Sequence, residues 1–407
     1  MTLFIKSYKY RIYPTKTQVN FLNENFGAAR FIWNQLVANF NNYGTENYIK
    51  NLSEVQLKQN NHWLKNRISY ILQQKSRDFF ETTKQYFNKS RKKKLGRPRF
   101  KKKGVCVDSF RIPAQAIGFQ KAFNFDKQTL KIPKLKQPLK LKIDRTFTGQ
   151  VKSITISKNN LDQYFVSVCV EEEIKSKVKT GKDIGLDLGL LDLVILSDGT
   201  RFQNPKYFRE TQTKLKKAQQ HLSRKTKGSS RYLKQKLKVA KIHKKITNQR
   251  NWYYHQISNY LVTKFDSIFV EDLNIQGMMK NRKLSKSIQD VSWSSLVNMI
   301  SYKCRWYGKE LLKIDRFFPS SKLCSSCGTK NDQMDLGTRS WICVCGVEHD
   351  RDVNAARNIL QEGLKVFHGV VSAESVDYDC GEIVRPESFL IGNWKADFDE
   401  AINSSIT

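Results

Sequence analysis

Two closely spaced pairs of cysteines constrain the folding of this chain more than any other feature. Cys324 and Cys327 form the first pair, and Cys343 and Cys345 form the second. Four thiolates on two tight turns are the usual ligands of a structural zinc ion, which then has no open coordination position. Two disulfides are the alternative, but thiols stay reduced inside cells. The sequence therefore predicts one structural Zn²⁺ ion at these cysteines, although the second pair is C-x-C rather than C-x-x-C.

An acidic segment follows the second cysteine pair directly. Asp350 is in position to cap a helix, because Val353 and Ala356 begin an apolar stripe at helical spacing. Asp352 then falls in the first turn, where a carboxylate is electrostatically favoured and can be directed at a metal ion. A capping role for both aspartates is the alternative at this point.

The charge composition points to a polyanionic partner. The 407 residues include 72 Lys and Arg but only 37 Asp and Glu, which gives a formal net charge of +35. Nucleic acid is the first candidate and an anionic membrane surface the second, but no apolar run approaches the roughly 20 residues of a spanning helix. Because no signal-peptide core is recognisable, we expect a cytoplasmic protein.

The N-terminal half predicts a helical segment enclosed by strands. Residues 3 to 13 alternate like a strand, and capping boxes that begin at Thr15 and Ser53 each introduce a long helical stretch. From residue 105 to residue 170 the apolar period changes to two, as in Val166, Val168 and Val170. We expect a small antiparallel barrel that the first strand joins.

Two strongly basic segments are candidates for contact with phosphates. Residues 91 to 103 form a basic run broken by Gly and Pro, and residues 205 to 250 predict a helical hairpin with a break near Gly228 and a single acid, Glu210. A solvated surface is the alternative for each segment. The residues expected to contact nucleic acid are Arg97, Arg99, Lys101, Lys102, Lys103, Arg224, Lys227, Arg231, Lys238 and Lys245.

Two further acids stand at the ends of apolar strands. Asp187 interrupts the first strand of a hairpin over residues 183 to 199, where burial of a carboxylate without a cation is costly. Glu271 ends an apolar strand, with Asp272 as its neighbouring competitor. Together with Asp350 or Asp352, these acids predict an oxygen-rich cluster suited to two Mg²⁺ ions about 3.5 to 4 Å apart, which can cleave phosphodiesters.

The order of these motifs resembles that of the TnpB family, the transposon-encoded ancestors of type V CRISPR effectors. The resemblance spans about residues 1 to 368 and rests on GLDLG at 185–189, VEDL at 270–273, PSSK at 319–322 and DRDVNAA at 350–356. It implies an endonuclease that uses a guide RNA derived from the transposon end to cleave double-stranded DNA beside a short motif. It also implies that Asp187, Glu271 and Asp352 are the ligands of two catalytic Mg²⁺ ions.

The fold implied by the resemblance is a multidomain α+β fold. It combines an RNase H-like (RuvC) nuclease domain that carries an inserted four-cysteine zinc ribbon with an N-terminal β-barrel wedge domain and a helical recognition domain. The expected segments are the first wedge strand (1–14), the recognition domain (15–103), the wedge barrel (104–180), the nuclease domain (181–319 and 349–368), the zinc ribbon that binds target nucleic acid (320–348) and an acidic, disordered tail (369–407).

Several further expectations concern partners and alternatives. We expect a monomer from a prokaryotic cytoplasm, with a lid over the active site at residues 274 to 292. An RNA-guided repressor that binds DNA without cutting it remains open as an alternative function. A guide-independent structure-specific nuclease or transposase accessory protein is the other alternative, and dependence on RNA would distinguish it.

Overall fold

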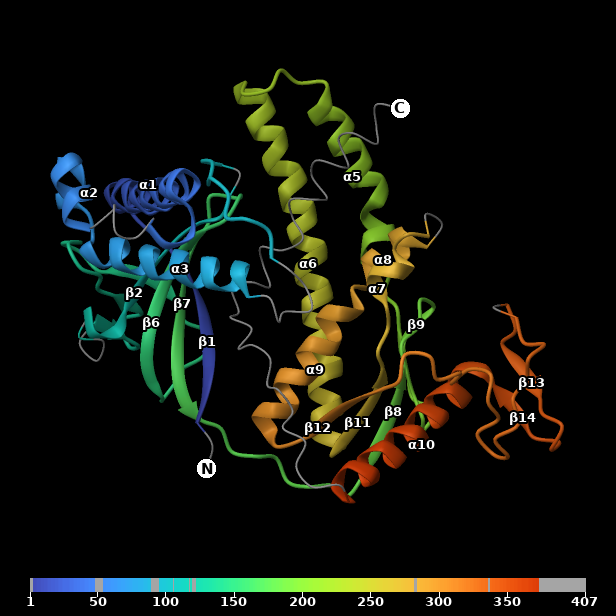
Figure 1. The fold of residues 1–407 in the computed structure, drawn as a ribbon. Helices are drawn as coiled ribbons and strands as arrows, with labels where there is room; N and C mark the ends of the chain where they lie inside the picture. Colours follow the sequence, from blue (N-terminus) through green and yellow to red (C-terminus); the bar gives the residue numbers. More distant parts are fainter. Residues whose placement is uncertain are drawn as a thin grey trace. The chain divides into compact units, whose positions relative to one another are not determined.

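The computed structural model describes residues 3–47, 54–88, 95–104, 106–116, 118, 122–281, 284–335 and 337–372. These residues fall into two compact units, and the boundary between the units lies at Glu173 and Ile174 (Figure 1). The finer division of the sequence into domains stays a prediction.

The N-terminal unit is built on one antiparallel sheet of seven strands, in the order β2-β6-β7-β1-β5-β4-β3. The strands are β1 (Leu3–Ile12), β2 (Asp108–Pro113), β3 (Phe123–Asn124), β4 (Thr129–Leu130), β5 (Leu139–Lys142), β6 (Gln150–Lys158) and β7 (Tyr164–Glu173). The helices are α1 (Lys16–Asn47), α2 (Glu54–Asn60) and α3 (Ser69–Phe87), with short 3-10 turns η1 (His62–Asn66) and η2 (Ala114–Ala116). Strands β2 and β3 stand at the two ends of the sheet, and its closure into a barrel stays a prediction.

The patterns predicted for the first strand, the first helix and the last strands are confirmed. In β7, Val166, Val168 and Val170 are buried while the residues between them are partly exposed. At the start of α1, the Thr15 amide donates to the Gln18 side chain at 3.0 Å and the Gln18 amide donates to the Thr15 hydroxyl at 3.4 Å. This reciprocal pair is the predicted capping box.

The second long helical stretch is not continuous as predicted. It is divided into α2, η1 and α3, and its expected cap, Ser53, lies outside the described residues. The break before α3 has a tertiary cause, because the extended residue Ile68 donates its amide to the side chain of Asn25 on α1 at 3.1 Å. That buried hydrogen bond stabilises a non-helical backbone that the local sequence does not reveal.

The C-terminal unit is built on a mixed five-stranded sheet in the order β10-β9-β8-β11-β12. Its strands are β8 (Asp183–Asp187), β9 (Asp192–Leu196), β10 (Arg201–Gln203), β11 (Ser267–Glu271) and β12 (Glu310–Ile314). A separate two-stranded ribbon consists of β13 (Ser340–Ile342) and β14 (Glu348–Asp350). The helices are α5 (Tyr207–Ser223), α6 (Ser230–Lys264), α7 (Ile275–Met278), α8 (Ser285–Val291), α9 (Trp293–Tyr307) and α10 (Arg351–Ser372).

Helices cover both faces of this mixed sheet. Alternate side chains such as Leu186 and Ile268 pack with α6 and α9 on one face, whereas Phe269 packs with Ile359 of α10 on the other. Because β11 is parallel to β8 on one side and to β12 on the other, it is the buried central strand that the sequence predicts. Helix α10 lies across β8 (Figure 1).

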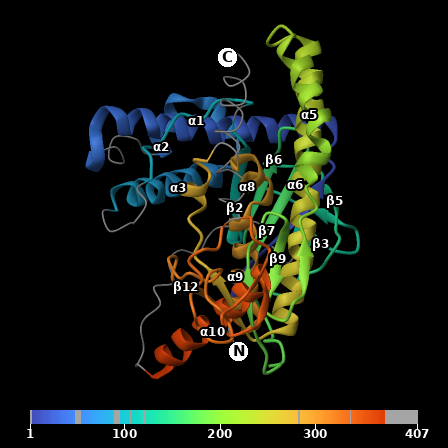
Figure 2. The same ribbon diagram turned by 90° about the vertical axis from the view of Figure 1, so that its right-hand side faces the viewer.

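The predicted basic hairpin is confirmed as α5 and α6, which run side by side (Figures 1 and 2). Ser229 caps α6 by accepting a hydrogen bond from the Tyr232 amide at 3.1 Å. Leu215, Leu222 and Val239 form the apolar contact between the two helices. Helix α6 continues without interruption to Lys264, beyond residue 250, where the predicted hairpin ends.

The structure bears in part on the expectations about membrane-spanning helices, the C-terminal tail and the lid. No helix in the described part of the chain is long and apolar enough to cross a membrane. Residues 369–372 belong to α10 and are therefore not part of a disordered tail, and residues 373–407 lie outside the described residues. The lid stays a prediction, since residues 282 and 283 of that segment are also outside the described ranges.

The contact between α10 and β8 generates a stability prediction. A Cβ atom on Gly185 would lie 2.1 Å from the Ala356 carbonyl oxygen and 2.7 Å from the Leu360 nitrogen, both backbone atoms that cannot rotate away. We expect Gly185→Ala to lower the free energy of unfolding by about 3 kcal/mol, as overpacking of a tight core does. Urea unfolding monitored by circular dichroism measures this loss.

The control is Gly369→Ala on α10, the helix that packs against Gly185. A Cβ atom there has no neighbour within 4 Å, so the change should be neutral or slightly stabilising. Equal unfolding midpoints for the two variants would show that the backbone approach at Gly185 is not a tight constraint.

Candidate active site and zinc centre

Neighbouring parallel strands place Asp187 and Glu271 at one edge of the mixed sheet. Strands β8 and β11 are paired in register, with Leu186 opposite Val270, and both strands end at the next residue. Because the carboxyl ends of parallel strands meet at the same edge, the two acids lie beside each other. The pairing of the backbones therefore fixes the relative positions of their carboxylates.

Helix α10 brings a third carboxylate to this edge. Asp352 lies in the first turn of α10, and its negative charge, like that of Glu271, acts on Asp187. Burial, followed by the repulsion from Glu271 and Asp352, raises the pKa of Asp187 to about 7, while Arg351 opposes this shift. Burial also raises the pKa of Glu271. The repulsion shows that the structure brings these carboxylates close enough to interact electrostatically at this edge of the sheet.

The two aspartates at the start of α10 have different surroundings. Asp350 accepts hydrogen bonds from the amides of Asp352 at 3.2 Å and Val353 at 3.0 Å, and it forms an ion pair with Arg201 at 2.8 Å. The predicted capping role of Asp350 is therefore confirmed. Among the described residues, Asp352 forms one long ion pair, at 3.8 Å to Arg339, and it is the aspartate whose charge acts on Asp187.

Asp272, the alternative to Glu271 as a member of the carboxylate cluster, is paired with basic side chains. Asp272 forms ion pairs with Lys313 at 3.0 Å and with Arg316. The hydrogen bonds from Lys313 and Arg316 outweigh the effect of burial and hold the pKa of Asp272 below its usual range. These contacts favour Glu271 over Asp272 as the member of the cluster.

A loop before the first cysteine pair is held against the carboxylates by α10. The Ser320 hydroxyl donates to the Glu271 carboxylate. Asn358 donates to the carbonyls of Ser320 and Leu323, both at 2.7 Å, and Asn354 donates to the Leu323 carbonyl at 2.6 Å. Both asparagines are almost completely buried. Their spacing of four residues on an apolar helix face is a signal that the sequence analysis missed.

A cavity of about 850 Å³ opens beside the carboxylates. Glu271, Ser320 and Arg351 contribute to its wall, together with Lys322 and the loop around Asp335. The cavity wall therefore combines two basic side chains, Lys322 and Arg351, with two acids, Glu271 and Asp335.

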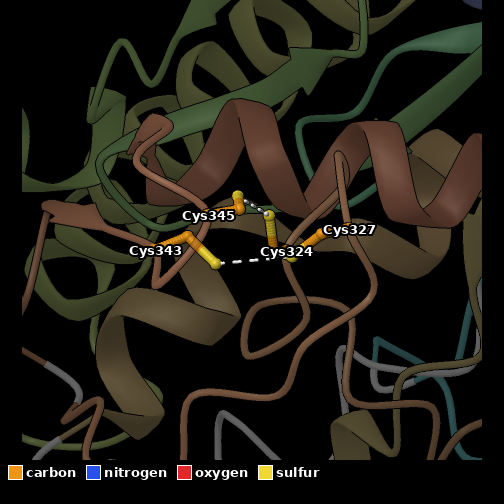
Figure 3. A group of neighbouring side chains, drawn as sticks. All are labelled: Cys324, Cys327, Cys343 and Cys345. Carbon is orange, nitrogen blue, oxygen red and sulfur yellow. Dashed lines mark hydrogen bonds between the residues drawn. The ribbon is translucent and has the colours of Figure 1, made fainter.

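The four predicted zinc ligands converge at one point in the ribbon that precedes α10 (Figure 3). All four Sγ atoms lie within 4.8 Å of one another, with 3.8 Å between Cys324 and Cys345 and 3.5 Å between Cys327 and Cys343. Zn–S bonds of about 2.3 Å to a tetrahedron of sulfurs require edges of about 3.8 Å, so these distances fit one zinc ion. No disulfide joins these cysteines, and C-x-C supplies its ligands as well as C-x-x-C does.

A buried histidine, which the sequence analysis did not single out, supports the zinc centre. The Nε2 atom of His349 lies 3.0 Å from the Cys324 Sγ atom, and its ring packs on Trp341 with 4.9 Å between ring centroids. An N–H group directed at a ligand sulfur orients that ligand and stabilises its thiolate form. His349 immediately precedes Asp350, the residue that caps α10, so the four-cysteine cluster lies close to the start of that helix.

Three family descriptions match parts of the chain. One described as "Probable transposase" matches residues 167–282, and one described as "Cas12f1-like, TNB domain" matches residues 293–359. A third, described as "Helix-turn-helix domain", matches residues 1–47. In the structure, residues 3–47 of this segment form β1 and the single helix α1, without a turn between two helices.

Two of the relatives match almost the whole chain, and another matches about a third of it. A protein of Streptomyces pristinaespiralis named "Putative RNA-guided DNA endonuclease" is 36% identical over 94% of this chain and 92% of its own length. "Putative RNA-guided DNA endonuclease InsQ" of Escherichia coli K12 is 30% identical over 94% of this chain and 95% of its own length. "TnpB-like protein L79" of Acanthamoeba polyphaga mimivirus is 29% identical over 32% of this chain and 26% of that protein. The chain belongs to the TnpB family.

The basic residues predicted for this TnpB-family protein fall into two groups. Arg224, Lys227, Arg231, Lys238 and Lys245 are all exposed on the α5–α6 hairpin. In the N-terminal unit the loop over residues 97 to 103 is also basic and largely exposed, but it is bound to α1. Within that loop, Lys101 lies 4.0 Å from the centre of the Trp33 ring, so part of its cationic surface is used inside the fold.

The zinc centre predicts a specific loss of metal. We expect purified protein to contain one zinc ion per chain and Cys324→Ser to lose it, because three thiolates and a hydroxyl bind zinc far more weakly than four thiolates. Elemental analysis by mass spectrometry measures the stoichiometry. Cys106→Ser, outside the cluster, should keep the zinc, and full zinc content in Cys324→Ser would contradict the ligand assignment.

The asparagines of α10 predict a loss of stability. We expect Asn358→Ala to lower the free energy of unfolding by about 2 to 3 kcal/mol, because two carbonyls lose their donor in a buried place. Gln361→Ala is the matched control, since Gln361 is exposed on the same helix and donates to Ser325 at 3.0 Å. Urea unfolding of both variants tests the difference, and an equal loss would contradict the role given to Asn358.

Proposed function

We propose that this TnpB-family protein is an RNA-guided endonuclease that cleaves double-stranded DNA beside a short sequence motif. The observation that carries the proposal is the cluster of Asp187, Glu271 and Asp352, whose charges act together at one edge of the mixed sheet. The names of the two long relatives support DNA as the substrate and RNA as the guide. Three antiparallel strands followed by two parallel ones support an RNase H-like (RuvC) nuclease domain.

The proposed chemistry is hydrolysis of phosphodiester bonds. Two Mg²⁺ ions bound by Asp187, Glu271 and Asp352 would activate a water molecule and neutralise charge on the leaving oxygen. Glu271 is held in position by the Ser320 hydroxyl, and Asp187 by the pairing of β8 with β11. Arg351 lines the larger cavity and would contribute positive charge where a phosphate of the substrate binds.

The remaining surfaces fit the proposed partners. A guide RNA from the transposon end and its duplex with target DNA would contact the exposed cations of α5 and α6, because closely spaced Lys and Arg displace the counterions of a phosphate backbone. The zinc ion would be structural, since four thiolates leave it no open position. The described part of the chain provides one such carboxylate cluster per monomer, so the two DNA strands would be cut in turn.

The carboxylate cluster predicts which acids cleavage requires. We expect Asp187→Ala, Glu271→Ala and Asp352→Ala each to lower the rate of target cleavage by about 1,000-fold or more, equivalent to about 4 kcal/mol of transition-state stabilisation. The experiment is to purify the protein with RNA transcribed from its flanking DNA, sequence the bound RNA and measure cleavage of matching DNA with Mg²⁺.

Two neighbouring acids provide controls for this experiment. Asp272→Ala and Asp350→Ala should cut at close to the wild-type rate, with Asp350→Ala less stable by about 1 kcal/mol because α10 loses its cap. Cleavage that survives Asp352→Ala but not Asp350→Ala would overturn the assignment. Target binding without cutting would indicate a repressor, and cutting that ignores the RNA sequence would indicate a guide-independent nuclease.

A further inference from the structure

A second cavity, of about 280 Å³, has no role in the chemistry above. Its wall combines the turn that follows β8, the start of α5, helix α8 and one residue of the zinc ribbon. The residues that matter for its chemistry are Leu190, Leu191, Leu284, Lys206, Arg209 and Arg339.

Hydrogen bonds join the separate segments of this wall into one site. Asn204 donates to the Leu190 carbonyl at 2.8 Å and accepts from the Lys206 amide at 3.1 Å, so it connects the turn after β8 to the start of α5. Arg209 of α5 donates to the Ser287 hydroxyl of α8 at 2.8 Å. Lys206 itself has a left-handed backbone, with φ of 48°, a conformation that side chains other than glycine adopt at a cost.

The cavity carries an excess of positive charge. Lys206, Arg209 and Arg339 contribute three cations, and neither Lys206 nor Arg209 has an ion pair with any residue that the structure describes. The carboxylate in the wall, Asp290, forms an ion pair with Arg250 at 3.2 Å. The free cations therefore favour an anionic ligand such as a phosphate.

The rest of the wall is apolar and open to solvent. Leu191 is 58% exposed and Leu284 is 41% exposed, which are high values for leucines beside a cluster of cations. An apolar surface next to free cations is complementary to a nucleotide, whose base is flat and poorly hydrated on its faces while its phosphate is charged. The volume is small, near the lower end for ligand cavities, and suits one nucleotide rather than a base pair.

The position of the cavity connects it to the proposed reaction. Leu190 follows Asp187 by only three positions along the chain, in the connection between β8 and β9. Arg339 extends from the wall toward the cluster, with its Nη1 atom 3.8 Å from the Asp352 carboxylate. A nucleotide in the cavity would thus lie next to a phosphodiester held at the carboxylates.

We propose that this cavity is a subsite for one unpaired nucleotide of the strand being cut, adjacent to the scissile phosphate. The base packs against Leu191 and Leu284, and Lys206 and Arg209 bind the phosphate that follows it. Because a paired base cannot enter, the subsite selects single-stranded DNA. This inference rests on the proposed nuclease function and adds to it the way in which the substrate strand is held.

The test uses the fluorescent base 2-aminopurine in single-stranded DNA. The full-length chain with Asp187→Ala is loaded with its guide RNA and mixed with target strands that carry the probe at successive positions. One position should give a distinct fluorescence change that Leu191→Ser and Leu284→Ser abolish and Leu233→Ser retains, since Leu233 is a similarly exposed leucine on α6. In the cleaving protein, Leu191→Ser should slow cutting about fivefold to tenfold.

Removal of the base provides the complementary measurement. An abasic nucleotide at the responding position should slow the wild-type protein to the rate of Leu191→Ser and should slow that variant no further. The inference is overturned if the wild-type protein cuts but no probe position responds, or if the leucine variants respond like Leu233→Ser. A localised, leucine-dependent signal in a protein that does not cut would support the subsite and overturn only the nuclease proposal.

Discussion

The close contact between α10 and β8 is the constraint on which the rest of the C-terminal unit depends. Gly185 lets the helix backbone approach the strand so closely that any side chain would meet the carbonyl of Ala356. That approach sets the position of α10 along β8. It therefore also sets the position of Asp352 relative to Asp187. A glycine in the middle of a strand usually weakens it, but here it allows one helix turn to reach the strand end.

Helix α10 connects the four-cysteine cluster to the carboxylate cluster. His349 contacts the ligand Cys324, and α10 starts two residues later, at Arg351. Asn354 and Asn358 on the first turns of α10 then bind the loop that carries Ser320 to Glu271. Buried hydrogen bonds are costly to lose because their groups cannot find water instead. The four-cysteine cluster and the acids are thus connected through a short chain of direct contacts.

The topology of the mixed sheet places acidic strand ends near the basic α5–α6 hairpin. Strands β8 and β11 end in the acids, whereas the antiparallel strands β9 and β10 lead directly into the basic hairpin. The connection at residues 188–191 therefore lies between negative and positive regions, and the smaller cavity is formed there. Opposite charges at such short separation suit a substrate whose phosphates need cations along the strand and metal ions at one bond.

The sequence by itself determined the features that depend on local spacing. The cysteine pairs, the capping box at Thr15, the apolar strand ending in Glu271 and the basic hairpin could all be predicted, because period, capping and ligand spacing act over a few residues. Tertiary structure alone decided the break before α3 and the contacts of Asn358 and His349. It also separated Asp352 from Asp350, two acids with the same local chemistry, since only the packing of α10 on β8 determines which carboxylate faces Asp187.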